Sequence, residues 1–176
     1  MITYAFIDAA NLFRDTGRYG GWEIDPRKLA SYLRETCGAE KIFYFSGTEM
    51  HLRGEAERYR RLASLGYLLL LKPVKYYQQK DGYIKKKANC DVDMTFLLMK
   101  EREYFDRLIF LSGDGDFLPV LRYLRESGKE VIVLAKARKT SRDIRRAFGN
   151  NFIDFDLLAR ALRTEEGSGE RRGAQP

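Results

Sequence analysis

The sequence is poor in the residues that support covalent or zinc-based catalysis. It has one histidine, His51, and two cysteines, Cys37 and Cys90. A Ser-His-Asp or Cys-His mechanism would need His51, and nothing near it in the sequence resembles an activated nucleophile, so we expect an ordinary surface residue there. The two cysteines show neither zinc-ligand spacing nor a disulfide framework, which favours a reduced, cytoplasmic protein.

Long hydrophobic runs are also absent. No apolar stretch is long enough to span a bilayer, and the first residues form an apolar segment containing Asp8 instead of a basic region followed by a cleavage site. We therefore expect no membrane partner and no secretory signal. The 176 residues, 44% of them hydrophobic and 32% charged, fit one globular domain. We place this domain at 1–163, before a disordered tail at 164–176 that has almost no apolar residues.

Apolar, β-prone runs alternate with amphipathic ones along this domain. We expect strands at 3–8, 41–46, 67–71, 108–111, 130–134 and 151–155. We expect helices at 26–38, 51–64, 91–101, 117–126, 141–148 and 156–162, with Asn89 and Asp156 among the N-caps. The alternation predicts an α/β fold whose central, mostly parallel sheet of five or six strands is covered by helices on both faces.

Carboxylates follow two of the expected strands. Asp8 ends the first strand, with Asn11 three residues on, and Asp114 and Asp116 follow the strand at 108–111. Ligands bind at the carboxyl ends of parallel strands, and like charges crowded there cost free energy unless a cation or a proton lies between them. Two glycines beside these acids would let the backbone turn sharply. The alternative is structural, with Asp8 and Asp114 capping helices and Asn11 forming a turn.

A second acidic pair, Asp91 and Asp93, begins a predicted helix. Residues two apart on a helix do not share a face, so we expect Asp91 to point into the site and Asp93 to support or cap it. Convergent carboxylates without a histidine favour Mg²⁺ or Mn²⁺ over Zn²⁺. The candidate metal ligands are Asp8, Asp91, Asp93, Asp114 and Asp116.

The segment 74–87 interrupts the alternation of strands and helices. Asp81-Gly82 lies between two β-prone arms, which predicts a β-hairpin. Lysines on the arms can neutralise phosphates and tyrosines can stack on bases, although edge lysines also keep an exposed hairpin soluble. A second basic run follows the strand at 130–134, and the net charge of +7 favours a polyanionic partner. The candidate nucleic-acid-binding residues are Lys75, Lys80, Lys85, Lys86, Lys87, Tyr77, Tyr83, Arg138, Lys139 and Arg142.

Three segments, 6–12, 87–93 and 112–117, resemble in order the three motifs of the NYN domain, in its LabA-like branch of the PIN-like nuclease group. The resemblance covers about residues 2–160. It implies a PIN-like three-layer α/β/α fold, here with a basic β-hairpin insertion. It also implies metal-dependent RNA hydrolysis by Asp8, Asp91, Asp114 and Asp116, with Asn11 at the family's polar position after the first strand. The family usually has glycine where this chain has Ala88.

The sequence thus predicts an endoribonuclease that uses Mg²⁺ or Mn²⁺ and has RNA as its partner, with DNA open as a second substrate and a homodimer as an assembly. One alternative is a non-catalytic RNA-binding or regulatory module. A pure binder gains nothing from a negative cluster facing a polyanion, which favours the nuclease. Another alternative is a different Mg²⁺-dependent phosphohydrolase, but the first strand is not followed by the Asp-x-Asp of haloacid-type phosphatases.

Overall fold

A single parallel sheet forms the centre of the chain in a computed structural model that describes residues 1–13, 21–78 and 84–164. The sheet has six strands in the order β3-β2-β1-β6-β7-β8, and every neighbouring pair is parallel. The strands are β1 Thr3–Asp8, β2 Ala39–Thr48, β3 Tyr67–Pro73, β6 Arg107–Leu111, β7 Glu130–Ala135 and β8 Phe152–Asp154. The sheet has the higher of the two predicted strand numbers and is wholly parallel.

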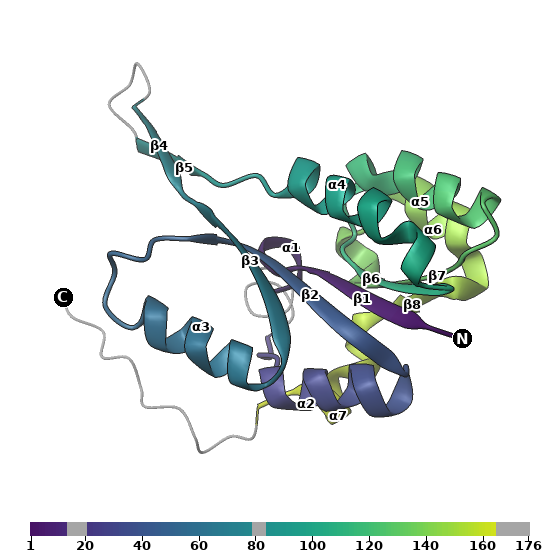
Figure 1. Cartoon of the computed structure of the whole chain (residues 1–176), viewed down its shortest axis with the longest axis horizontal. Helices are drawn as coiled ribbons and strands as arrows, with labels where there is room; N and C mark the ends of the chain where they lie inside the picture. Colours follow the sequence, from purple (N-terminus) through teal and green to yellow (C-terminus); the bar gives the residue numbers. More distant parts are fainter. Residues whose placement is uncertain (14–20, 79–83, 165–176) are drawn as a thin grey trace.

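Helices cover both faces of the sheet (Figure 1). One face carries α1 Ala9–Phe13, α2 Pro26–Ser31 with the helical turn Tyr32–Thr36, α3 Glu55–Ser64 and α7 Ala159–Leu162. The other carries α4 Asp91–Glu101, α5 Leu118–Glu126 and α6 Arg142–Phe148. The predicted α/β fold with helices on both sides of a parallel sheet is confirmed, and in the described part of the chain no helix has the length and apolar character to cross a membrane.

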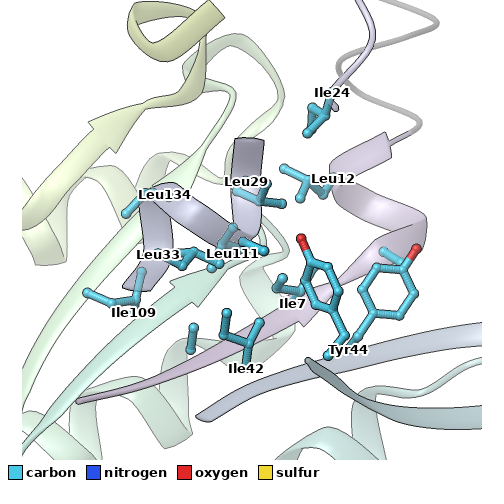
Figure 2. Packing of buried hydrophobic residues seen from close by; sticks show 14 of the residues in the cluster. Ile7, Leu12, Ile24, Leu29, Leu33, Ile42, Tyr44, Ile109, Leu111 and Leu134 are labelled. Atoms are coloured by element: carbon cyan, nitrogen blue, oxygen red, sulfur yellow. The ribbon is translucent and has the colours of Figure 1, made fainter. Parts of the chain in front are cut away.

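The two faces of β1 belong to two separate hydrophobic cores, because side chains alternate along a strand. Ala5 and Ile7 pack with the α2 and α3 side, where Figure 2 shows Ile7 near Ile42 and Tyr44. Tyr4 and Phe6 pack with the α4, α5 and α6 side. A strand buried on both faces disfavours a charged side chain until it ends, and the first carboxylate of β1, Asp8, lies at the carboxyl edge of the sheet.

Several helix starts differ from the predicted ones. α3 begins at Glu55 and not at 51, because Gly54 adopts a left-handed conformation, with φ of +88°, just before the helix. His51 therefore lies in the preceding turn. The N-cap position of α4 is Cys90, which makes no side-chain cap bond, while the predicted cap Asn89 accepts from the N–H of Asp91. Asp154 rather than Asp156 caps the helical turn that leads into α7.

The basic segment forms a small sheet of its own. β4 Lys75–Gln78 and β5 Ile84–Lys87 pair antiparallel, with Lys75 opposite Lys87. The expected Asp81-Gly82 turn between the two arms lies outside the described residues, as does most of the expected tail.

Gly47, near the end of β2, lies against the segment that leads into α4. A Cβ atom on Gly47 would come within 2.6 Å of the Cβ of Ala88 and within 3.3 Å of Cγ2 of Val74. The backbone of β2 can approach this segment closely only because position 47 has no side chain. This contact sets the distance between the end of β2 and the start of α4, which carries Asp91.

We predict that Gly47→Ala destabilises the fold by about 1–3 kcal/mol, because the added methyl overlaps Ala88. Ala88→Gly in the same chain should recover part of the loss, since it removes the overlapping atom. The measurement is urea unfolding of the wild type, both single variants and the double variant. Strictly additive losses in the double variant would contradict the predicted contact.

Candidate metal and active site

Asp8 lies at the end of β1 and connects two loops. One carboxylate oxygen accepts a hydrogen bond from the backbone N–H of Asn11 at 3.1 Å, and the other accepts from the Ser112 hydroxyl at 3.1 Å. Burial raises the pKa of Asp8, these two hydrogen bonds oppose the rise, and the charges of Asp91 and Asp114 add to it. Asp8 thus caps α1, as the structural alternative supposed, and also holds the loop that follows β6.

The turn after β6 is fixed by its own side chains and by Asn11. The amide oxygen of Asn11 accepts from the Gly113 N–H at 3.1 Å. The Asp114 N–H donates to the Ser112 hydroxyl at 3.2 Å, and a carboxylate oxygen of Asp114 accepts from the Asp116 N–H at 3.0 Å. Asp114 is therefore an N-cap, but a carboxylate offers about four acceptor positions, so capping leaves it able to bind a cation.

The two glycines of this turn are needed for a different reason from the one expected. Neither Gly113 nor Gly115 has a positive φ, so other residues could adopt the same backbone conformation. A Cβ on Gly113 would instead meet the Oγ1 of Thr140 at 2.5 Å, and one on Gly115 would meet Ser141 at 3.1 Å. The loop after β7 packs directly against the acidic turn, and the Ser141 N–H donates to the Gly113 carbonyl at 3.0 Å.

Asp91 enters the site from the first turn of α4. Its backbone N–H donates to the Asn89 side chain at 2.8 Å, which fixes where the helix begins. Burial raises the pKa of Asp91, the Asn89 contact opposes the rise, and the charges of Asp114 and Asp116 add to it. Carboxylate oxygens of Asp91, Asp114 and Asp116 lie within 4.8 Å of one another.

These three carboxylates, here called the acid cluster, suit a hard divalent cation. Two ligands on opposite sides of Mg²⁺ lie about 4.2 Å apart, because each bond is about 2.1 Å long, so the observed separation needs little adjustment. Each residue of the acid cluster offers a carboxylate oxygen as its ligand atom, which fits Mg²⁺ or Mn²⁺. Asp8 lies beside the cluster and lines, with Asp91 and Asp114, a cavity of about 180 Å³.

Asp93 has a different environment from the acid cluster. Its carboxylate forms an ion pair with Lys72 at 2.6 Å, and both side chains are about half exposed. The charge of Lys72 also reaches Asp91, where it opposes the rise in the pKa of that carboxyl. Asp91 and Asp93 therefore lie in different environments, as their spacing on the helix predicted, and their separate roles stay a prediction.

The candidate nucleic-acid-binding residues lie on two segments. Lys75 and Tyr77 are exposed on β4. Arg138 and Lys139 are exposed in the helical turn after β7, and Arg142 is exposed as the first residue of α6. The backbone of β5 carries Lys85, Lys86 and Lys87. Lys80 and Tyr83 lie outside the described residues.

Sequence reasoning missed several supporting residues. Ser112 lies two residues before Asp114, so its polar side chain could have indicated a local hydrogen bond, whereas Asn89 was expected at the start of its helix. Thr140, Ser141 and Lys72 are distant in sequence from the acids they approach, and no local pattern indicates their positions.

We predict that excess Mg²⁺ or Mn²⁺ stabilises the wild type against thermal unfolding, by about 2.7 kcal/mol at a hundredfold excess over Kd. Asp114→Asn should lose most of this response because it removes a charged ligand. The matched control is Asp93→Asn, which removes one carboxylate from the same region but not from the acid cluster. An equal rise in the unfolding temperature of Asp114→Asn would exclude the cluster as the metal site.

Comparisons with known proteins show the family of the chain and relatives of its fold. The family model described as the NYN domain matches residues 3–165. The chain is 27% identical over 155 residues to the low amplitude and bright protein LabA of Synechococcus elongatus, covering 86% of this chain and 82% of that protein. Its fold matches the crystal structure of VPA0982, a protein of unknown function from Vibrio parahaemolyticus, with a TM-score of 0.68 and 20% identity over 91% of this chain and 94% of that one. Because the family model matches nearly the whole chain, the protein belongs to the NYN domain family and is a distant homologue of LabA.

Proposed function

We propose that the protein is a metal-dependent endoribonuclease of the PIN-like nuclease group. The observation that carries the proposal is the acid cluster, in which three carboxylates from α4 and the turn after β6 meet within 4.8 Å. Three like charges held this close are costly without a cation, and a cation there can bind a phosphate. The NYN family match over residues 3–165 supports the nuclease class.

The acidic residues have distinct tasks in this mechanism. Asp91 and Asp114 would hold the metal from the half-buried side of the cluster, and Asp116 would complete the site from its exposed side. When bound by these residues, Mg²⁺ or Mn²⁺ would supply Lewis-acid chemistry, which would make a water more acidic and offset charge on the phosphate. Asp116 is the member best exposed to orient or deprotonate the attacking water. Asp8 and Asn11 keep the turn after β6 in position through Ser112 and Gly113.

Basic residues on both sides of the cluster would bind the flanking phosphates. Lys72 lies at the end of β3, close to Asp91, and the β4–β5 pair continues the chain beyond it. On the other side, the segment with Arg138 and Arg142 follows β7, whose loop contacts the acidic turn. Phosphate contacts of this kind position a nucleic acid without reading its sequence.

We expect wild type to cut RNA in Mg²⁺ or Mn²⁺ and not in EDTA, and Asp114→Asn to be slower by about a hundredfold or more, because a metal ligand is lost. A circular RNA is the substrate of choice, since it has no ends and only an endonuclease can open it. Asp93→Asn is the matched control. Equal cutting by wild type and Asp114→Asn would refute the assignment, and binding without cutting would favour the RNA-binding module.

We further expect that replacing Lys85, Lys86 and Lys87 by alanine weakens RNA binding and reduces its dependence on salt. Each lost phosphate contact should lower the slope of log K against log salt by about 0.7 for single strands. The measurement is fluorescence anisotropy of a labelled RNA from 50 to about 300 mM salt. Arg27→Ala, an exposed basic residue of α2, is the control. An unchanged slope in the triple variant would assign these lysines to solubility alone.

A further inference from the structure

A second and larger cavity adjoins the acid cluster on the other face of β2. Its volume is about 570 Å³, and its walls come from α1, α3 and β2. Ala10, Ser46 and Gly47 border both this cavity and the smaller one that Asp8 and Asp91 line. The two spaces thus meet at these three residues, near the carboxyl edge of the sheet. We call the larger space the β2–α3 cavity.

The β2–α3 cavity has the size and lining of a small-molecule site. Pockets that bury a ring-containing ligand usually span about 300–1,000 Å³, with apolar walls and a few polar groups. Phe13 and Tyr44 provide aromatic wall surface, and the charged groups that line it in the described chain are three glutamates and one arginine. This excess of negative charge disfavours a phosphate and favours an uncharged ring that donates hydrogen bonds.

Two polar side chains in the cavity have unused hydrogen-bonding capacity. Tyr44 is buried with 3% exposure, and within the described chain its hydroxyl has no hydrogen-bond partner, although Arg58 and Glu55 line the same cavity. The contacts that hold the carboxylate of Glu55 in the described residues are long, at 3.4 Å to Arg58, 3.4 Å to Thr48 and 3.5 Å to the N–H of residue 49. Contacts of that length are weak, so Glu55 can accept shorter ones from a ligand.

Guanine is the base whose edge best matches these groups. Its ring N1–H and amino N2–H are adjacent donors that suit a carboxylate, and its O6 and N7 are acceptors that suit a guanidinium. Glu55 and Arg58 present that pair of groups one helical turn apart on α3, with Arg58 also held over the Tyr59 ring at 4.7 Å. Adenine, cytosine and uracil do not offer two adjacent donors on this edge.

We propose that the β2–α3 cavity accepts an unpaired guanine next to the phosphate that is cleaved. The proposal rests on the ribonuclease function. An RNA strand held at the acid cluster would pass Ala10 and Gly47, which border both cavities, and so bring a neighbouring base to the β2–α3 cavity. Glu55 accepts from the guanine edge, Arg58 and Tyr44 contact its acceptors, and Phe13 packs on its ring. The subsite would make cutting prefer guanine at one position beside the cut.

The test is calorimetric titration of the full chain with GMP, IMP, AMP and UMP in EDTA, where the shared phosphate cancels from the comparison. We expect GMP to bind about tenfold more tightly than AMP or UMP. IMP, which lacks the N2 amino group, should bind less tightly than GMP. Glu55→Gln should abolish the preference, and Glu57→Gln, an exposed glutamate of the same helix that pairs with Arg60, should keep it. Equal binding of GMP and UMP by wild type would overturn the proposal.

Two further measurements keep the result interpretable. Tyr44→Phe removes only a hydroxyl without a partner in the described chain, so its fold should persist and its affinity for GMP should drop about threefold. If Glu55→Gln fails to fold, an unchanged GMP affinity in Tyr44→Phe would overturn the proposal.

Nucleotide binding requires no cleavage, so a GMP preference without RNA cutting would refute only the nuclease. Cutting with no base preference, mapped on a mixed-sequence RNA, would refute only the guanine subsite.

Discussion

Mutual repulsion among carboxylates at the carboxyl edge of the sheet is the constraint on which this site depends. Two unit charges about 4 Å apart in a partly screened environment repel by about 4 kcal/mol, and three such groups meet here. Burial adds to the cost for Asp8 and Asp91, whose pKa values are both raised chiefly by loss of water. Asp8 is held by hydrogen bonds from Asn11 and Ser112, and Asp91 is positioned by its backbone N–H, which donates to Asn89. A bound cation would offset the remaining repulsion.

Close backbone contacts hold the elements that carry the acids. Gly113 and Gly115 lie against Thr140 and Ser141, which brings the loop after β7 onto the acidic turn. Gly47 lies against Ala88, which brings the end of β2 onto the start of α4. Each contact joins an element on which an acid lies to a neighbour distant in the sequence. The geometry of the acid cluster is therefore a property of the packed sheet edge and not of the acidic motifs alone.

The end of β2 has a cavity on each of its faces. The smaller cavity belongs to the acid cluster, and the β2–α3 cavity has aromatic and acidic walls. A nucleic acid strand carries two kinds of group that suit these two cavities. Its phosphates are charged, and its bases are uncharged rings with polar edges. The proposed nuclease site and the proposed guanine subsite use this match on opposite faces of one strand.

Local patterns in the sequence determined the elements and their order. Apolar runs such as 3–8 and 108–111 are typical of parallel strands buried on both faces, and the acids that follow parallel strands lie at one edge of the sheet. The helix periodicity likewise places Asp91 and Asp93 on different faces of their helix.

Tertiary structure decided what those patterns leave open. The ion pair of Asp93 with Lys72, the approach of Thr140 to Gly113 and the pairing of β4 with β5 in a separate sheet all join residues that no local periodicity relates. The start of α3 was predicted too early because a left-handed glycine at position 54, and not the apolar pattern, fixes it. The β2–α3 cavity exists only because α1 and α3 pack beside β2, so no sequence pattern indicates it. Local sequence fixes which residues can reach the carboxyl edge, and packing between distant segments fixes how far apart they lie.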